Sequence, residues 1–165
     1  MLAARGAEVH AFEPNPHAFA VLRDRFTANP RVHCHEAAVA VEAGRARLHL
    51  HRDTDADPVG RATGSSLLVD KGNVSDDRFV EVEAVDLVAF VESLARPVAL
   101  LKLDVEGLEP PLLTALAQSG ALTEIRHVLV EMHDRLATGG HTPEGTAVRA
   151  LLAQPQFAHV RLDWD

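Results

Sequence analysis

The pattern of apolar and polar positions in the first 35 residues predicts a strand, a helix and a second strand. Residues 7–12 form an apolar run that ends in Glu-Pro-Asn-Pro, a combination typical of a strand followed by a helix. Asn15 suits the N-cap of that helix, and Pro16 suits its first position. Apolar side chains then recur at helical spacing as far as Phe26, and residues 32–35 predict the next strand. This segment therefore predicts a strand-helix-strand unit.

The middle of the chain predicts two strands on either side of a long loop. Polar and apolar residues alternate over 45–51, as in a half-buried strand, and again over 80–84. Asp86 can then cap a short helix. Residues 53–77 are polar and rich in Gly, Ser and Asp, which predicts a loop, and loops of this length in compact domains are usually functional or mobile.

The second half continues the alternation of strands and helices. Residues 98–104 are almost continuously apolar, which predicts a central parallel strand covered on both faces. Pro110 is tolerated in the first turn of the helix that follows, and residues 127–132 predict another buried strand. A helix over 146–152 and a short strand over 160–164 complete the pattern. The alternation favours an α/β fold with a doubly wound sheet.

Length, composition and charge narrow the class of protein. The 165 residues suit a single domain, and 47% hydrophobic residues with 24% charged residues indicate a globular chain. The net charge is −8 and the 16 basic residues are scattered, which argues against a nucleic-acid partner. No apolar run approaches the ~20 residues of a membrane helix, and Cys34 is the single cysteine. We therefore expect no membrane partner and a cytoplasmic location.

Polar residues directly after the apolar runs are the first candidates for function. In doubly wound sheets, ligands bind beyond the carboxyl ends of the strands. Five residues occupy such places: Glu13, Glu36, Asp104, Glu106 and His133. The alternative for each acidic residue is a structural role as the cap of the next helix.

Other polar residues in the strands invite different hypotheses. Lys102 lies within an apolar strand, so we expect it to reach an acidic neighbour or the surface rather than the substrate. His33 and His35, and likewise His49 and His51, are two residues apart and could share a face of a strand. We favour solvated strand histidines over metal ligands and predict no metal site, because structural zinc sites usually contain closely spaced cysteine pairs.

Two segments resemble signatures of FkbM-type methyltransferases. They are His-Ala-Phe-Glu-Pro-Asn-Pro at 10–16 and Leu-Lys-Leu-Asp-Val-Glu-Gly-Leu-Glu at 101–109, of which the second is the more specific. Further segments follow in the family's order at 36–39, 64–67, 82–87 and 130–133. The resemblance covers residues 8–133 and implies a Rossmann-like, mostly parallel methyltransferase sheet that binds S-adenosylmethionine.

The resemblance also implies roles for the candidate residues. The carboxylate of Glu13 would bind the ribose of the cofactor, the turn at Glu36 and Ala37 would lie against the adenine, and Asp104 would face the methionine part. The implied cofactor-binding set is Glu13, Pro14, Asn15, Glu36, Ala37 and Asp104.

A hydroxyl acceptor needs a base, because an alcohol is a weak acid. The implied candidates are Asp104 and His133, with Glu106 close by. The residues do not rank the first two, and a structural role is about as plausible for His133 as a catalytic one.

Members of this family should begin with a strand and a loop resembling Asp-Val-Gly-Ala-Asn-x-Gly. The present sequence begins in what looks like the helix after that loop, so we expect the sheet to lack its first strand and its glycine-rich loop. Three explanations are open: a start placed too far downstream, a gap filled by another segment or subunit, or a remnant without activity. We favour the first. Exposed sheet edges would also allow a homo-oligomer.

The sequence therefore favours an O-methyltransferase that acts on a hydroxyl of a sugar, a polyketide or another small metabolite. The alternative is a non-catalytic methyltransferase-like module that binds a partner. An NAD-dependent enzyme is a third, weaker hypothesis, because Glu13 suits it but the segment at 104–107 does not.

Overall fold

The computed structural model describes residues 2–51, 60, 65–67, 74–135 and 139–162. The chain forms two compact units, each with its own parallel strands. The first unit comprises Met1–Val39 and Ala43–Val85, and the second comprises Ala40–Glu42 and Asp86–Asp165.

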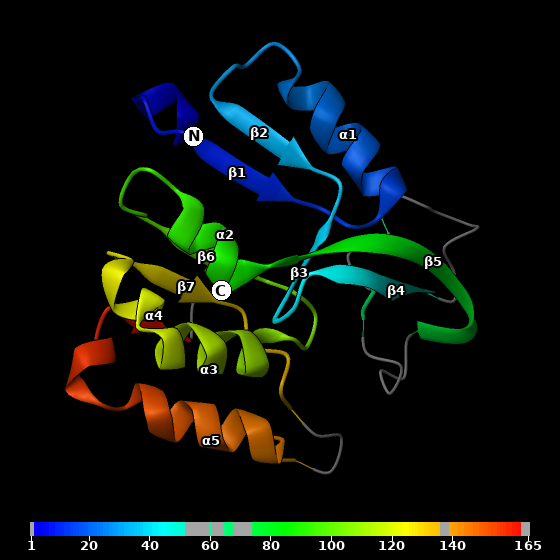
Figure 1. The fold of residues 1–165 in the computed structure, drawn as a ribbon. Coiled ribbons are helices and arrows are strands. Elements are labelled where there is room, and N and C mark those ends of the chain that lie inside the picture. Colours follow the sequence, from blue (N-terminus) through cyan, green and yellow to red (C-terminus); the bar gives the residue numbers. More distant parts are fainter. Residues whose placement is uncertain (1, 52–59, 61–64, 68–73, 136–138, 163–165) are drawn as a thin grey trace. The chain divides into compact units, whose positions relative to one another are not determined.

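The first unit begins with the strand-helix-strand segment that the sequence predicts. After a 3₁₀ turn at Ala3–Arg5, the chain forms β1 (Val9–Phe12), α1 (Pro16–Phe26) and β2 (Val32–His35). Strands β1 and β2 pair in parallel, with Val9 opposite Val32, and α1 contacts β2 (Figure 1). The predicted N-cap, the predicted first helical residue and the predicted second strand are all confirmed.

The rest of the first unit is a three-stranded sheet in the order β3-β5-β4. Its strands are β3 (Ala38–Ala40), β4 (Gly44–His51) and β5 (Val74–Asp86), and β4 is antiparallel to β5. Ala38, Leu48 and Val82 form its buried core. The prediction of a loop over 53–77 is wrong for its last four residues, because residues 74–77 already belong to β5. Most of the remaining loop, namely 53–59, 61–64 and 68–73, lies outside the described residues.

The second unit contains a parallel sheet in the order β6-β7-β8, together with four helices among its described residues. Its elements are α2 (Leu87–Ser93), β6 (Leu101–Leu103), α3 (Glu109–Ser119), α4 (Ala121–Glu124), β7 (Val128–Val130), α5 (Pro143–Leu152), a 3₁₀ turn (Pro155–Phe157) and β8 (Val160–Arg161). The expectation that residues 98–104 form the central strand is wrong for this sheet. Strand β6 is only three residues long, and β7 lies in the middle.

Helix α3 provides much of the core of the second unit. It contacts α2, α4 and α5, and Figure 1 shows α3 and α5 side by side. Leu113 and Leu116 of α3 and Val128 and Val130 of β7 are fully buried. Burial of apolar area at about 25 cal/mol per Å² is the main stabilising contribution in such a core.

The ends of the helices follow from local chemistry. The side chain of Asp86 accepts a hydrogen bond from the N–H of Ala89 at 3.0 Å, which confirms the predicted cap of α2. The hydroxyl of Thr142 accepts from the N–H of Gly145 at 3.0 Å and caps α5 in the same way. Gly120 ends α3 with a φ of 86°, a left-handed conformation that favours glycine.

The observed architecture is a mixed α/β fold with parallel sheets, as the sequence predicts at this level. In the part of the chain that the structure describes, we find no helix with the length and apolar character needed to span a bilayer.

Candidate functional site

The first predicted residue, Glu13, lies where β1 ends. Its backbone N–H donates to the carbonyl of His35 at 3.0 Å and so extends the parallel pairing by one residue. Its half-buried carboxylate turns back, and Oε1 accepts a hydrogen bond from the N–H of Asn15 at 2.8 Å. The carboxylate is therefore held at the carboxyl edge of the β1–β2 pair, where α/β sheets bind ligands.

Asn15 has a structural role in the turn that follows. Its side chain is 1% exposed, and Oδ1 accepts from the N–H of His17 at 3.0 Å and from that of Ala18 at 3.5 Å. Its Nδ2 donates to the hydroxyl of Ser65 at 3.3 Å. These contacts assign the amide of Asn15 to capping α1. Cofactor contacts from Asn15 and the half-buried Pro14 remain predictions.

Glu36 and Ala37 follow β2 at the same edge. Glu36 is exposed, whereas Ala37 is buried with 4% exposure. Because β1 and β2 are parallel neighbours, Glu13 and Glu36 come after adjacent strand ends. The structure therefore brings these two carboxylate residues to one edge of the first unit, as the sequence predicts.

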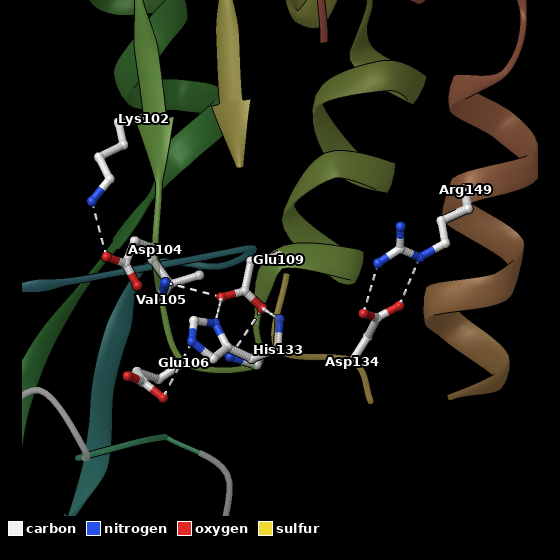
Figure 2. Close-up of polar contacts among 9 residues, drawn as sticks. Lys102, Asp104, Val105, Glu106, Glu109, His133, Asp134 and Arg149 are labelled. Carbon is white, nitrogen blue, oxygen red and sulfur yellow. Dashed lines mark hydrogen bonds and ion pairs between the residues drawn. The ribbon is translucent and has the colours of Figure 1, made fainter. Parts of the chain in front are cut away.

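Asp104, Glu106 and His133 follow the adjacent parallel strands β6 and β7 in the second unit (Figure 2). The Oδ2 atom of Asp104 accepts a hydrogen bond from the Nζ of Lys102 at 3.0 Å, and both side chains are partly exposed. This ion pair confirms the prediction that Lys102 reaches an acidic neighbour. It also shows that one oxygen of Asp104 is already engaged.

The loop after β6 has an unusual backbone. Glu106 has a φ of 56°, and in the described part of the chain it is the only residue other than glycine with a positive φ. Gly107 follows with a φ of 116°. A left-handed conformation costs a side-chain-bearing residue about 1–2 kcal/mol, so other contacts must hold the loop in place.

The side chain that holds this loop is Glu109, which is fully buried at the start of α3. Its Oε1 accepts from the N–H of Val105 at 3.0 Å and contacts the Nδ1 of His133 at 2.8 Å. Its Oε2 accepts from the N–H of Gly107 at 3.0 Å and from the backbone N–H of His133 at 3.4 Å. Figure 2 shows this carboxylate between the loop and His133.

These contacts determine the protonation of the Glu109–His133 pair. Burial by itself raises the pKa of Glu109, but hydrogen bonds from His133 and from the backbone outweigh it and hold the pKa below its usual value. An ionised carboxylate only accepts hydrogen bonds, so the Nδ1 of His133 carries the proton. The other ring nitrogen, Nε2, lies 3.8 Å from Oε2 of Glu106 and is the atom suited to accept a proton.

A second ion pair fixes the segment after His133. Asp134 is 2% exposed, and its two oxygens accept hydrogen bonds from the Nε of Arg149 at 3.1 Å and from its Nη2 at 2.9 Å (Figure 2). The hydrogen bond from the guanidinium holds the pKa of Asp134 below its usual range. The pair joins the end of β7 to α5 and so restricts the backbone beside His133.

The sequence predicts no role for Glu109, although this residue belongs to the more specific of the two family segments. The available signal was its place in Asp-Val-Glu-Gly-Leu-Glu, directly before two prolines. A glutamate in the first turn of a helix is common, because it interacts favourably with the helix dipole while exposed to solvent. The local pattern therefore did not indicate that this carboxylate would be fully buried.

Two further findings concern possible metal ligands. His49 is 7% exposed and its backbone pairs with Ser66 in both directions, so the interpretation of His49 as a solvated residue is wrong. In the second unit, ligand atoms of Asp104, Glu131 and His133 lie within 4.8 Å of one another. Two of these three side chains are exposed carboxylates, which are common on protein surfaces without a bound ion.

Comparison with known proteins identifies one family. The family model described as the Methyltransferase FkbM domain matches residues 1–162. This match confirms the resemblance that the sequence showed at 10–16 and 101–109. Searches of curated proteins and of solved structures returned no significant match.

Proposed function

Because the chain belongs to the FkbM methyltransferase family, we propose that it transfers a methyl group from S-adenosylmethionine to a hydroxyl of a small molecule. The proposed acceptors are sugars, polyketides and other small hydroxylated metabolites. The observation that carries the hydroxyl assignment is the buried Glu109, whose carboxylate orients His133 beside Glu106 at the carboxyl ends of β6 and β7.

The donor set of the described residues is compatible with S-adenosylmethionine. The carboxylates of Glu13 and Glu36 follow adjacent parallel strands, and carboxylate oxygens complement the paired hydroxyls of a ribose. Asp104 would complement the positive charge of the methionine part. When bound, S-adenosylmethionine supplies a methyl group that is already activated by its positively charged sulfur.

His133 is the proposed base. Its Nε2 would take the proton from the acceptor hydroxyl, while the carboxylate of Glu109 keeps Nδ1 protonated and stabilises the imidazolium that forms. Asp104 is the weaker candidate, because one of its oxygens is already paired with Lys102. Glu106 would contribute negative charge near Nε2.

Calorimetric titration of S-adenosylmethionine into the 165-residue protein tests the donor assignment. We expect Glu13→Gln to weaken binding by at least about tenfold, equivalent to the loss of one charged hydrogen-bonding partner. Glu83→Gln on β5 is the matched control, because Glu83 is exposed and has no proposed role. Parent affinity in Glu13→Gln would refute the ribose assignment. A second titration, into a chain extended upstream through any encoded glycine-rich loop, tests whether that loop is needed.

Transfer of a labelled methyl group to a panel of methyl glycosides and hydroxylated lactones tests the chemistry. We expect His133→Asn to lower kcat by about 10²–10⁴-fold while affinity for the donor is retained. Glu109→Gln should lower kcat in the same direction with KM unchanged, because the amide no longer holds the same tautomer. Full activity of His133→Asn would assign the base elsewhere. If donor binding and transfer are both absent, the non-catalytic module becomes the better hypothesis.

Three broader expectations belong to this proposal. The parallel pairs β1–β2 and β6–β7–β8 support a doubly wound, Rossmann-like arrangement. The single cysteine supports a cytoplasmic location. Association of identical chains through sheet edges is proposed as well, and sedimentation measurements over a range of concentrations would test it.

A further inference from the structure

One face of the β1–β2 pair is lined with imidazole rings. The parallel register places His10 opposite His33 and Phe12 opposite His35, so these four side chains share a face of the sheet. The rings of His10 and His33 are stacked, with centroids 4.8 Å apart. The sequence suggested only pairs along a single strand, whereas the structure brings together histidines from two strands.

The polar atoms on this face lie close together. The Nε2 of His33 lies 3.0 Å from Oε1 of Glu8, and both side chains are nearly half exposed. One ligand atom from each of Glu8, His10 and His33 lies within 4.8 Å of the others. The Nδ1 of His10 also lies 3.1 Å from the Nε2 of His35.

We propose that Glu8, His10 and His33 bind a divalent transition metal ion, with zinc as the preferred occupant. Two imidazoles and one carboxylate form a donor set that suits zinc, and the nitrogen ligands disfavour magnesium and calcium. Bonds of 2.0–2.1 Å in a tetrahedral site place neighbouring ligand atoms roughly 3.3 Å apart, and the Nε2 of His33 already lies 3.0 Å from Oε1 of Glu8.

The backbone already provides the separation that such a site needs. Neighbouring strands of a sheet lie about 4.7–4.9 Å apart, and His10 and His33 are opposite each other in the parallel register, so a nitrogen from each ring can be directed at one ion. The partial exposure of Glu8 and His33 gives an ion access from solvent. Bound metal would join β1 to β2 just before the strand ends that carry Glu13 and Glu36. This site is independent of the proposed methyl transfer.

The first test is a calorimetric titration of Zn²⁺ into the full metal-free protein. A parallel titration with Co²⁺ is monitored by visible absorption, because that absorption reports tetrahedral coordination. We expect one equivalent to bind. The double variant His10→Gln/His33→Gln should lower the affinity on the order of 10²-fold or more. His17→Gln/His127→Gln is the matched control, because it removes two exposed histidines that lie outside β1 and β2.

Two further variants test whether the ion binds at this group of residues or at the other group of possible ligands. Glu8→Gln removes one ligand at an exposed position and should weaken binding by at least about tenfold without affecting the stacked rings. His133→Asn removes the histidine from the other group of possible ligands and should leave the first equivalent unchanged. The proposal would be overturned if the parent protein bound no Zn²⁺ or if the control lost as much affinity as the double variant. It would also be overturned if His133→Asn lost affinity and the double variant did not.

Discussion

The turn after β1 and the loop after β6 both place acidic residues at the carboxyl end of a parallel strand, but they are held in different ways. After β1, Glu13 and Asn15 accept hydrogen bonds from backbone groups two or three residues away, and Asn15 makes one further hydrogen bond to Ser65. After β6, Glu109 links the loop to His133, 24 residues further along the chain. The first arrangement is mainly local, whereas the second exists only once β6, α3 and β7 have come together.

The energetic consequences also differ. Asn15 is a neutral cap that satisfies backbone N–H groups at a helix start. Glu109 is an ionised group without exposure to water, which is stable only because four hydrogen-bonding contacts compensate for its desolvation. Disruption of the loop after β6 should therefore be much more costly than disruption of the turn after β1.

The largest effect is expected for Glu109→Ala. Removal of the fully buried carboxylate leaves partly buried donors of Val105, Gly107 and His133 without their acceptor, and the free energy of unfolding should fall by about 3–5 kcal/mol. Urea denaturation monitored by circular dichroism measures this loss of stability. Glu109→Gln keeps the shape of the side chain and one acceptor oxygen, so its free energy of unfolding should fall clearly less. A loss below about 1 kcal/mol in the alanine variant would show that the loop does not depend on this carboxylate.

A smaller effect is expected for Gly145→Ala in α5. A methyl group at this position would overlap Oδ2 of Asp134 and lie 2.7 Å from the Cβ of Asp134, so the Asp134–Arg149 pair would have to move. We expect a loss of about 1–3 kcal/mol, measured by the same denaturation experiment. Thr146→Ala, at the next and exposed position, is the control and should be close to neutral. Equal stability of the two variants would contradict the close packing.

Asn15→Ala tests the turn after β1 directly. Loss of the cap should lower the free energy of unfolding by about 1 kcal/mol, clearly less than Glu109→Ala. Asn15→Ser keeps an oxygen acceptor at the cap and should recover most of the loss. If Asn15→Ala proved as damaging as Glu109→Ala, the distinction between a local turn and a long-range loop would fail.

The smallest effect is expected in the dependence of the free energy of unfolding on acid pH. Because the hydrogen bond from Arg149 lowers the pKa of Asp134, the carboxylate contributes stability above its unfolded pKa of about 3.9 and loses that contribution as the pH falls through the lower folded value. The free energy of unfolding of the parent should therefore decline more steeply below about pH 4 than that of Asp134→Asn. Parallel pH profiles of the two proteins would contradict this assignment.

The elements that the sequence predicts well are those set by neighbouring residues. Asn15 and Pro16 specify the start of α1, and the predicted boundaries of β2 are those of the structure. Strand β5 begins earlier than expected because Val74 pairs with His51 of β4, although the local composition of residues 74–77 resembles a loop. Position in a sheet depends on partners that are distant in the sequence, so local composition alone could not reveal it.

The sequence by itself determined the α/β alternation, the caps of α1 and α2 at Asn15 and Asp86, and the placement of acidic residues after the strands, because these depend on short-range periodicity and side chains within a few residues. The tertiary structure decided that Glu109 is buried, that it holds His133, and that His10 and His33 share a face. The physical reason is that burial and hydrogen bonding between distant segments depend on how strands and helices pack. A carboxylate or an imidazole has no fixed role until that packing defines its surroundings.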